Sequence, residues 1–250
     1  MADGQMKQAA SIGIILPTYC EEENVSDIIN SIEGLGLNAK ILVIDDSSPD
    51  NTEKVVRQLQ QKYGNIFLLK RPYKMGLGTA ITDGFKYLLS LKDPPDYIIT
   101  MDADRSHNPK DIPKLLQKAI EGSDLVVGSR YCAGGKIKGW TTSRLIISKI
   151  ANKIAQTIIK LPINDYTSGF RCYSREYIKK ALPKLHSQTY EIQIETLRQA
   201  KLLGLKVGER PVTFENRKRG KSKLTPNEIA TFLKYILKTL LNDILKNYLH

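Results

Sequence analysis

The stretch Asp96-Tyr-Ile-Ile-Thr-Met-Asp-Ala-Asp104 decides the fold class, because it is an apolar run that ends on two carboxylates. Such a run is typical of a buried strand. A second acidic pair, Asp45-Asp46, follows another apolar run, Ala39-Lys-Ile-Leu-Val-Ile. In an open α/β sheet, ligands bind at the carboxyl ends of the strands. Together the two pairs favour a site for a divalent cation and the nucleotide that it holds over solvated turn acids.

Short apolar runs alternate with helical patterns on both sides of this stretch. The runs begin at Ser11, Lys40, Asn65, Tyr97 and Asp124, and the helical patterns lie near residues 22–34, 51–63, 78–91 and 109–121. This alternation predicts βαβ units. We therefore expect a disordered tail over residues 1–10, an α/β domain with a mostly parallel sheet over 11–225, and an amphipathic helix over 226–250.

Length, cysteine content and charge restrict the class of protein. A chain of 250 residues can bury a sizeable core in one domain. Three cysteines without metal-type spacing indicate a reduced, intracellular protein. We see no N-terminal signal and no apolar run of about 18 residues, and so expect no membrane-spanning segment. The formal net charge of +12 predicts an anionic partner: nucleic acid, a lipid surface or a phosphorylated substrate.

Two patterns in the second half of the chain indicate amphipathic helices. One face of residues 142–160 carries Ile147, Ile150, Ala151, Ile154 and Ile158, with lysines opposite. A core-packing helix and a basic helix on a membrane surface both fit this pattern. The apolar stripe of the final helix rotates by about 40° at each repeat. Either its first half packs on the domain and its second half faces a partner or lipid, or the whole helix curves along the core.

Several polar motifs fall near the same edge of the predicted sheet. Pro17-Thr-Tyr-Cys-Glu21 offers a flat ring and a carboxylate, and Lys74-Met-Gly-Leu-Gly78 lets backbone N–H groups approach a phosphate or a turn pack closely. Arg130 ends the fifth strand, where it could bind a diphosphate bidentately or pair with a neighbouring acid. Arg144, at a helix entrance, could reach the same pocket.

A basic segment and a polar turn complete the motifs. Asn164-Asp-Tyr-Thr-Ser-Gly-Phe-Arg171 is a turn whose Ser-Gly favours close backbone approach. Asn216-Arg-Lys-Arg-Gly-Lys-Ser-Lys223 follows a predicted strand over residues 206–214. It is either a solvated loop or a lid that folds over bound phosphates.

Taken in order, these motifs resemble those of the dolichyl-phosphate (polyprenyl-phosphate) mannosyltransferases of glycosyltransferase family 2. The likeness runs from about Ile12 to Leu237 and includes Met-Asp-Ala-Asp-x-Ser-His-x-Pro, Gly-Ser-Arg-Tyr, Gly-Trp-x-x-x-Arg and Ser-Gly-Phe-Arg. It implies a GT-A fold that transfers mannose from GDP-mannose to dolichyl phosphate with inversion, using Mg²⁺ or Mn²⁺. The sequence offers no convincing general base, and a largely dianionic acceptor phosphate needs none.

The resemblance also implies a role for individual residues. The guanosine would be framed by Pro17, Tyr19, Glu21, Ile44 and Asp46. The metal and diphosphate would meet Asp102, Ala103 and Asp104, with Ser106 at the position of a third metal ligand. The donor phosphates would be bound by Arg130, Arg217 and Lys223, and Arg144 would lie between donor and acceptor phosphates. Asp104, Arg130 and Arg144 are therefore the expected catalytic residues.

The chain departs from the family pattern at Cys20, Arg105 and Lys221, where asparagine, leucine and glutamate are common. Some relatives carry C-terminal transmembrane helices, which we do not find here. The resemblance thus implies a peripheral catalytic subunit, anchored by small membrane subunits on the cytosolic face of the endoplasmic reticulum in a eukaryote or of the plasma membrane in a prokaryote.

Three other functions are compatible with parts of the sequence. The same lipid could receive glucose or N-acetylglucosamine from a UDP donor, since only the resemblance argues for mannose. A non-catalytic nucleotide-binding subunit fits less well, because both acidic pairs are retained. A nucleic-acid binder is suggested by charge alone, but the chain has no recognisable nucleic-acid motif and its cations cluster beside the expected phosphate site.

Overall fold

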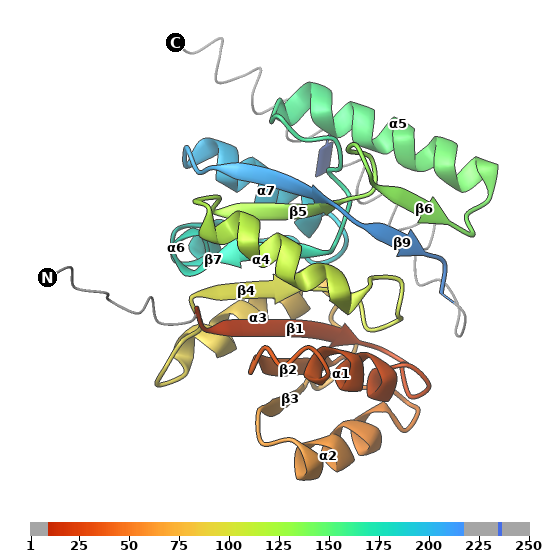
Figure 1. The fold of residues 1–250 in the computed structure, drawn as a ribbon, viewed down its shortest axis with the longest axis vertical. Coiled ribbons are helices and arrows are strands. Elements are labelled where there is room, and N and C mark those ends of the chain that lie inside the picture. The colour runs from red at the N-terminus through yellow and green to blue at the C-terminus, as the bar shows by residue number, and fades with distance from the viewer. Residues whose placement is uncertain (1–9, 218–234, 237–250) are drawn as a thin grey trace, which may run out of the picture.

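A seven-stranded sheet forms the centre of the computed structural model, which describes residues 10–217 and 235–236 (Figure 1). Across the sheet the strands are β3 (Ile66–Lys70), β2 (Lys40–Asp45), β1 (Ile12–Thr18), β4 (Tyr97–Thr100), β7 (Arg171–Ser174), β5 (Leu125–Ser129) and β8 (Val207–Pro211). All neighbours run parallel except β7, which is antiparallel to both β4 and β5. The predicted mostly parallel sheet is confirmed, whereas β7 was not expected.

Helices cover both faces of the sheet. On one face lie α1 (Val25–Glu33), α2 (Thr52–Lys62) and α4 (Ile112–Ile120), the last of which follows a short 3-10 turn at Pro109–Asp111. On the other lie α3 (Leu77–Ser90), α5 (Thr142–Ile159), α6 (Arg175–Ala181), a second 3-10 turn at Leu182–Lys184, and α7 (Ile192–Leu202). Strand side chains alternate between these two layers, because successive residues of a strand point to opposite faces. Ile14 and Leu16 thus pack on α1, and Ile15 packs on α3.

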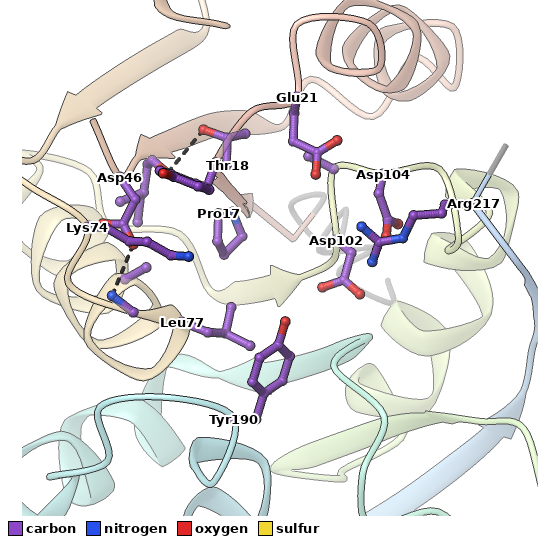
Figure 2. Close-up of a pocket in the computed structure, with 15 residues that line it drawn as sticks. Pro17, Thr18, Glu21, Asp46, Lys74, Leu77, Asp102, Asp104, Tyr190 and Arg217 are labelled. Atoms are coloured by element: carbon purple, nitrogen blue, oxygen red, sulfur yellow. Dashed lines mark hydrogen bonds and ion pairs between the residues drawn. The ribbon is translucent and has the colours of Figure 1, made fainter. Parts of the chain in front are cut away.

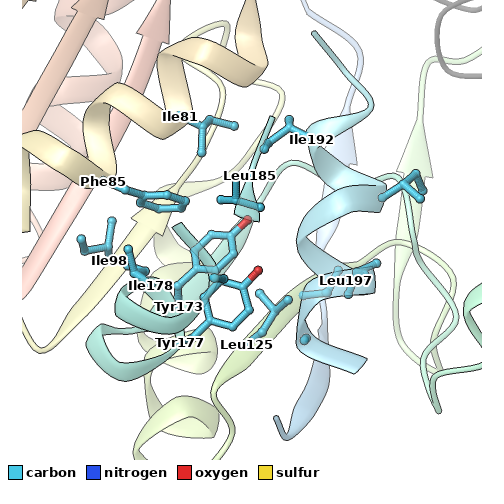
Figure 3. Close-up of a cluster of buried hydrophobic side chains, with 14 of the residues drawn as sticks. Ile81, Phe85, Ile98, Leu125, Tyr173, Tyr177, Ile178, Leu185, Ile192 and Leu197 are labelled. Carbon is cyan, nitrogen blue, oxygen red and sulfur yellow. The ribbon is translucent and has the colours of Figure 1, made fainter. Parts of the chain in front are cut away.

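The core under α3, α6 and α7 is rich in aromatic rings (Figure 3). Phe85 meets Tyr173 edge-on, with ring centroids 5.1 Å apart, and Tyr173 lies 5.2 Å from Tyr177. The Tyr177 hydroxyl donates to the carbonyl of Thr196, which satisfies its only polar group in this buried position. This packing fixes α7 against the sheet, and α7 carries residues of the site described below.

The segment predicted as one strand over residues 206–214 is in fact two strands with different partners. β8 pairs with β5, and after Val212 the chain continues as β9 (Thr213–Glu215), which pairs with β6 (Lys136–Lys138). β6 lies in the stretch predicted as a flexible loop. Both additional strands have three residues and alternate polar and apolar side chains, too short a pattern to predict. The change of partner directs the chain toward the acidic loop, where the Glu215 N–H donates to the Ser106 carbonyl.

The exposure of α5 bears on the two interpretations of its apolar face. Ile147 and Ile150 are each 55% exposed, so the core-packing interpretation does not hold for these two residues. Ile154 and Ile158 are partly buried against the core, while the fully buried residues are Asn152, Ala155 and Ile159. The reason is polar: the Asn152 amide accepts from the Tyr166 N–H at 2.6 Å and donates to the Thr167 hydroxyl at 3.0 Å. The pattern of apolar residues on a helical wheel does not predict this orientation, because the hydrogen bonds of Asn152 determine it.

Of the predicted final helix, the described residues are Tyr235 and Ile236, which are helical. Ile236 is buried in the core on the face of the sheet that α7 covers, as expected for the first half of that helix. The rest of the helix, the tail over 1–9 and the basic segment from residue 218 onward, including Lys223, lie outside the described residues. Within the described part of the chain, no helix has the length and apolar character to cross a bilayer.

Candidate active site

A pocket lies where the carboxyl ends of β1, β2 and β4 meet the N-terminal ends of α3 and α7 (Figure 2). Most residues expected to bind the donor line it, namely Pro17, Tyr19, Glu21, Ile44, Asp46, Asp102, Ala103, Asp104 and Arg217. Residues not expected from the sequence complete the wall, among them Thr18, Leu77, Ala80 and Tyr190. The motifs after the first, second and fourth strands thus converge on one cavity, as the position of ligand sites in open α/β sheets requires.

The acidic pair after β2 organises loops. Asp45 is fully buried and accepts from the Ser48 N–H at 3.0 Å. Asp46 forms an ion pair with buried Arg71 and accepts from the Gly76 N–H at 3.0 Å. These bonds tie the loop before α3 to the pocket wall. Of the two acidic pairs, Asp102 and Asp104 remain the candidates for binding a cation.

Three loops at this edge contain a non-glycine residue with left-handed backbone geometry. Cys20, Ser47 and Arg105 have φ angles of 55°, 53° and 65° and follow β1, β2 and β4 respectively. Such conformations are disfavoured for residues with a Cβ and persist where the surrounding structure holds them. Their clustering around one pocket is typical of a functional site.

Asp104 lies in the most polar part of the pocket. The N–H of Ser106 donates to its Oδ1 at 2.9 Å, and the Arg217 guanidinium pairs with its Oδ2 at 2.8 Å. Burial raises the pKa of Asp104, but hydrogen bonding from Ser106 and the charge of Arg217 outweigh this and hold the pKa below its usual value. The carboxylate is therefore ionised at neutral pH, and the cation that it binds in this structure is Arg217.

Asp102 presents its side chain to the cavity, with 43% of it exposed, while its backbone is fixed from behind. The Asp102 N–H donates to His107 Nδ1 at 3.0 Å, so this ring nitrogen carries no proton. The His107 ring stacks on Phe170, with centroids 5.1 Å apart. His107 was not among the expected site residues, although it stands five positions after Asp102 in the same loop.

These oxygens fit a divalent cation. Mg²⁺ takes one or two protein carboxylates and completes its shell with phosphate oxygens and water. Asp102 and Asp104 offer the carboxylates, and the nearby Ser106 hydroxyl is buried without a hydrogen-bond partner among the described residues. No group of three or more histidine, cysteine, aspartate or glutamate side chains suited to a metal occurs in the described part of the chain. Two carboxylates and a hydroxyl fit a cation that takes its other ligands from phosphate and water.

Arg130 pairs with a neighbouring acid, which is one of the two partners that the sequence left open for it. Its Nε and Nη2 donate to buried Asp165 at 2.7 and 2.8 Å, and Nη2 also donates to Thr167. Arg130 itself is buried and does not line the pocket. Burial lowers the pKa of Arg130, but the charge and hydrogen bonds of Asp165, with a smaller contribution from Asp102, outweigh this and raise it. Its Nη1 atom takes no part in these bonds, and this end of the guanidinium remains for a second anion.

The guanidinium groups of Arg130 and Arg144 lie over the Trp140 ring, and Arg217 is close enough for its charge to act on Arg144. The Arg144 carbon Cζ lies 4.1 Å from the centre of the Trp140 ring, and that of Arg130 lies 5.4 Å from it. Partial burial, followed by the charges of Arg217 and Arg130, lowers the pKa of Arg144. Three cations that repel one another beside two carboxylates form a site for a polyanion.

Comparison with known proteins identifies the family. The glycosyl transferase family 2 model matches residues 13–182. The chain belongs to glycosyltransferase family 2. It is 36% identical to the polyprenol monophosphomannose synthase of Mycolicibacterium smegmatis over 218 residues, which cover 86% of this chain and 82% of the relative. It is also 36% identical to the dolichol-phosphate mannosyltransferase of Pyrococcus furiosus over 235 residues, 92% of this chain but 63% of that relative.

Solved structures show the same fold. The glucosyl-3-phosphoglycerate synthase of Mycobacterium tuberculosis, in complex with Mn²⁺, UDP and phosphoglyceric acid, superimposes with a TM-score of 0.65 at 20% identity, covering 93% of this chain and 78% of that one. Its complex with phosphoglyceric acid alone gives a TM-score of 0.67 at 20% identity, with coverage of 93% and 79%. At this level of identity the likeness establishes the GT-A-like fold.

Several residues of this glycosyltransferase escaped sequence reasoning. Tyr190 projects into the pocket from the loop before α7, and Arg171 is the largest fully buried side chain. Both belong to parts of the chain whose strands and helices are short or polar. The Ser-Gly-Phe-Arg motif was the available signal for Arg171, and nothing in the local sequence distinguishes Tyr190 from the other tyrosines.

Proposed function

We propose that this glycosyltransferase transfers mannose from GDP-mannose to a polyprenyl phosphate, with inversion at the anomeric carbon. The observation that carries the proposal is a donor pocket with an acidic pair, Asp102 and Asp104, next to a cluster of three arginines. The acidic pair suits a nucleotide diphosphate bound through a metal. The arginine cluster suits a second phosphate, that of the acceptor. The names of the two relatives at 36% identity give the sugar and the class of lipid.

The chemistry follows from the charges. A phosphate monoester has a second pKa of about 6, so the acceptor is largely dianionic at neutral pH. One of its oxygens attacks the anomeric carbon while the bond from that carbon to the GDP oxygen breaks, and the electron pair leaves on GDP. No proton has to be removed from the nucleophile. The protein must hold two anions together and stabilise the charge on the leaving diphosphate.

The described residues divide this work. Pro17, Tyr19, Glu21, Ile44 and Asp46 frame the nucleoside. Asp102 and Asp104, with Ser106, would hold Mg²⁺ or Mn²⁺, which when bound neutralises the charge that develops on the leaving diphosphate. Arg217, now on Asp104, is placed to move onto the diphosphate, with Lys223 as its proposed companion. Arg144 and the free end of Arg130 would receive the acceptor phosphate.

The acceptor phosphate must come from a lipid surface, and α5 supports such an approach. Ile146, Ile147 and Ile150 are 53–55% exposed on the outer face of this helix, and exposed Lys149 and Lys153 lie among them. Apolar side chains mixed with lysines are typical of helices that lie in the interface of an anionic membrane. We propose that the chain is peripheral to the cytosolic face of a membrane and that small membrane subunits assist its anchorage.

The test is product identification with purified protein. Polyprenyl phosphate is incubated with GDP-mannose, UDP-glucose or UDP-N-acetylglucosamine, each with Mg²⁺, with Mn²⁺ and with chelator, and the lipid product is identified by mass. A hexosyl-phosphate lipid is expected with GDP-mannose and a metal only. A lipid product formed only from a UDP-sugar would show that GDP-mannose is not the donor. Nucleotide binding without any lipid product would contradict the proposed transferase activity.

A further inference from the structure

The side chain of Gln193 is buried near the residues that line the donor pocket, and its amide oxygen is unsatisfied within the described part of the chain. Gln193 is 4% exposed, and its Oε1 has no hydrogen-bond partner among the described residues. A buried amide oxygen without a partner is costly in a native protein, and its occurrence calls for an explanation such as a bound ligand. Gln193 lies in the first turn of α7, and its N–H donates to the carbonyl of Tyr190, a residue that lines the pocket.

Gly169 locates this amide relative to Asp102. A methyl group added at Gly169 would lie 3.3 Å from Gln193 Nε2, 3.6 Å from Asp102 Oδ1 and 3.9 Å from His107 Cε1. The amide nitrogen of Gln193, the carboxylate of Asp102 and the edge of the His107 imidazole therefore lie around the point that a side chain at residue 169 would occupy. Figure 2 shows the hydroxyl end of Tyr190 directed into the pocket, on the side of Asp102.

Arg171 fixes the segments around this point. It is fully buried, and it donates to the carbonyls of Tyr166 at 3.0 Å, Ser168 at 2.8 Å and Gln193 at 2.7 Å. These bonds join the segment that carries Gly169 to the first turn of α7. The position of the Gln193 backbone is thus set before any ligand binds, as a preorganised site requires.

We propose that Gln193, together with Tyr190 and Asp102, binds the hydroxyl groups of the donor hexose over Gly169. This inference rests on the proposed function in taking the ligand to be a nucleotide sugar. The group chemistry favours a sugar: an amide offers both donor and acceptor atoms, and a carboxylate accepts from hydroxyl groups but repels a phosphate. Gly169 lies beside Asp102, one of the carboxylates proposed to meet the diphosphate, where the sugar of a bound donor must begin.

Two variants test the subsite, and a third provides a control. Gln193→Leu keeps the volume of the side chain but loses its polar atoms, and Gly169→Ala adds a methyl group next to the Gln193 amide. Gly169 has an ordinary backbone geometry, so alanine is compatible with the fold. Gln199→Leu alters a buried glutamine of the same helix whose Nε2 reaches the Lys184 carbonyl, 3.4 Å away, outside the pocket.

The measurements are the affinities for GDP and GDP-mannose by calorimetry and the kcat/KM for lipid mannosylation. Gln193→Leu and Gly169→Ala are each expected to lower kcat/KM by about 10-fold to 100-fold. The first removes the hydrogen-bond partner of a buried sugar hydroxyl, and the second displaces that hydroxyl from its partners. The affinity for GDP, which has no sugar, should stay within about twofold, and Gln199→Leu should match the wild type.

Unchanged kcat/KM in Gln193→Leu, or an equal loss of affinity for GDP and GDP-mannose, would overturn the subsite. Failure of the proposed function is a separate result, because the same comparison applies to any donor that the wild type accepts. If only a UDP-sugar is used, that sugar is compared with UDP. If no lipid product forms, the gain in affinity of each nucleotide sugar over its nucleotide diphosphate still decides whether Gln193 contacts the sugar.

Discussion

At the scale of single residues, Asp104 has the most direct consequence for activity. Asp104→Asn removes one negative charge but keeps the shape of the side chain and the acceptor for the Ser106 N–H. We expect it to abolish transfer with either metal while thermal unfolding remains cooperative. The measurement is the rate of lipid mannosylation beside a circular-dichroism melt. Near wild-type rates in a folded variant would contradict a role for Asp104 in holding the metal.

Arg217 is predicted to bind the donor diphosphate. Arg217→Ala should weaken GDP binding by about 1–3 kcal/mol, the range for a charge-assisted hydrogen bond, as should Lys223→Ala in the basic segment. Arg105→Ala is the matched control, since Arg105 stands next to Asp104 but forms an exposed pair with Asp27 at 2.6 Å. Calorimetry with GDP and Mg²⁺ measures all three. An Arg217 variant that binds GDP as tightly as the control would show that this arginine serves the fold alone.

The pair between Arg130 and Asp165 is predicted to be a condition of folding. Both groups are buried, and removing the charge of one leaves the other uncompensated. Asp165→Asn should lower the free energy of unfolding by about 3–5 kcal/mol, whereas Asp27→Asn, which breaks the exposed pair with Arg105, should lower it by less than about 1 kcal/mol. Urea titration followed by circular dichroism compares them. Equal urea midpoints for the two variants would contradict the prediction that folding depends on the pair between Arg130 and Asp165.

The sequence predicted single residues unevenly. The carboxylates of the pocket could be found because each follows its own strand directly, and a strand end has a known place in the sheet. The partner of Arg130 could not, because Asp165 is 35 positions away and joins it only through tertiary packing. Gln193 was invisible for the same reason, since its meaning depends on Gly169 and Asp102 in other segments.

At the scale of elements, the amphipathic pattern of α5 was sound, yet its interpretation depended on a residue that the pattern ignored. Asn152 sets the inward face, and the outward face carries Ile146, Ile147 and Ile150. The long parallel strands and their helices could be predicted, because their apolar periods extend over many residues. β6 and β9 could not, since each has three residues, and β7 could not, because its four residues, Arg171–Ser174, do not form an apolar run.

Vesicle binding tests the outward face of α5. Replacing Ile146, Ile147 and Ile150 together by serine should reduce co-sedimentation with anionic vesicles by about an order of magnitude, in proportion to the apolar area lost. A control variant, Ile120→Ser with Leu202→Ser, removes exposed apolar residues elsewhere on the surface. Because the replaced side chains are exposed, both variants should keep the unfolding midpoint. Equal sedimentation of the two variants would reject α5 as the membrane contact.

At the scale of the whole molecule, the layered α/β architecture agrees with the prediction. The position of most of the final helix lies outside the described residues and can be tested by experiment. Ile236 packs in the core, consistent with a first half that belongs to the domain. Replacing Leu241, Leu245 and Leu249 by glutamate should leave GDP-mannose binding intact and detach the protein from membranes or from an anchoring subunit. Membrane co-sedimentation before and after a high-salt wash measures this, and an unchanged membrane fraction would assign that stripe to the core.

Trp140 gives the molecule an internal optical reporter. It is the single tryptophan of the chain, and it lies beneath the guanidinium of Arg144 at the point where the proposed donor and acceptor phosphates would meet. Its buried indole N–H has no hydrogen-bond partner among the described residues. Any anion that draws Arg144 away from the ring changes the surroundings of the only indole that emits. Unlabelled protein can therefore be followed by stopped-flow fluorescence, and the order in which nucleotide sugar and lipid phosphate arrive can be read directly from the emission.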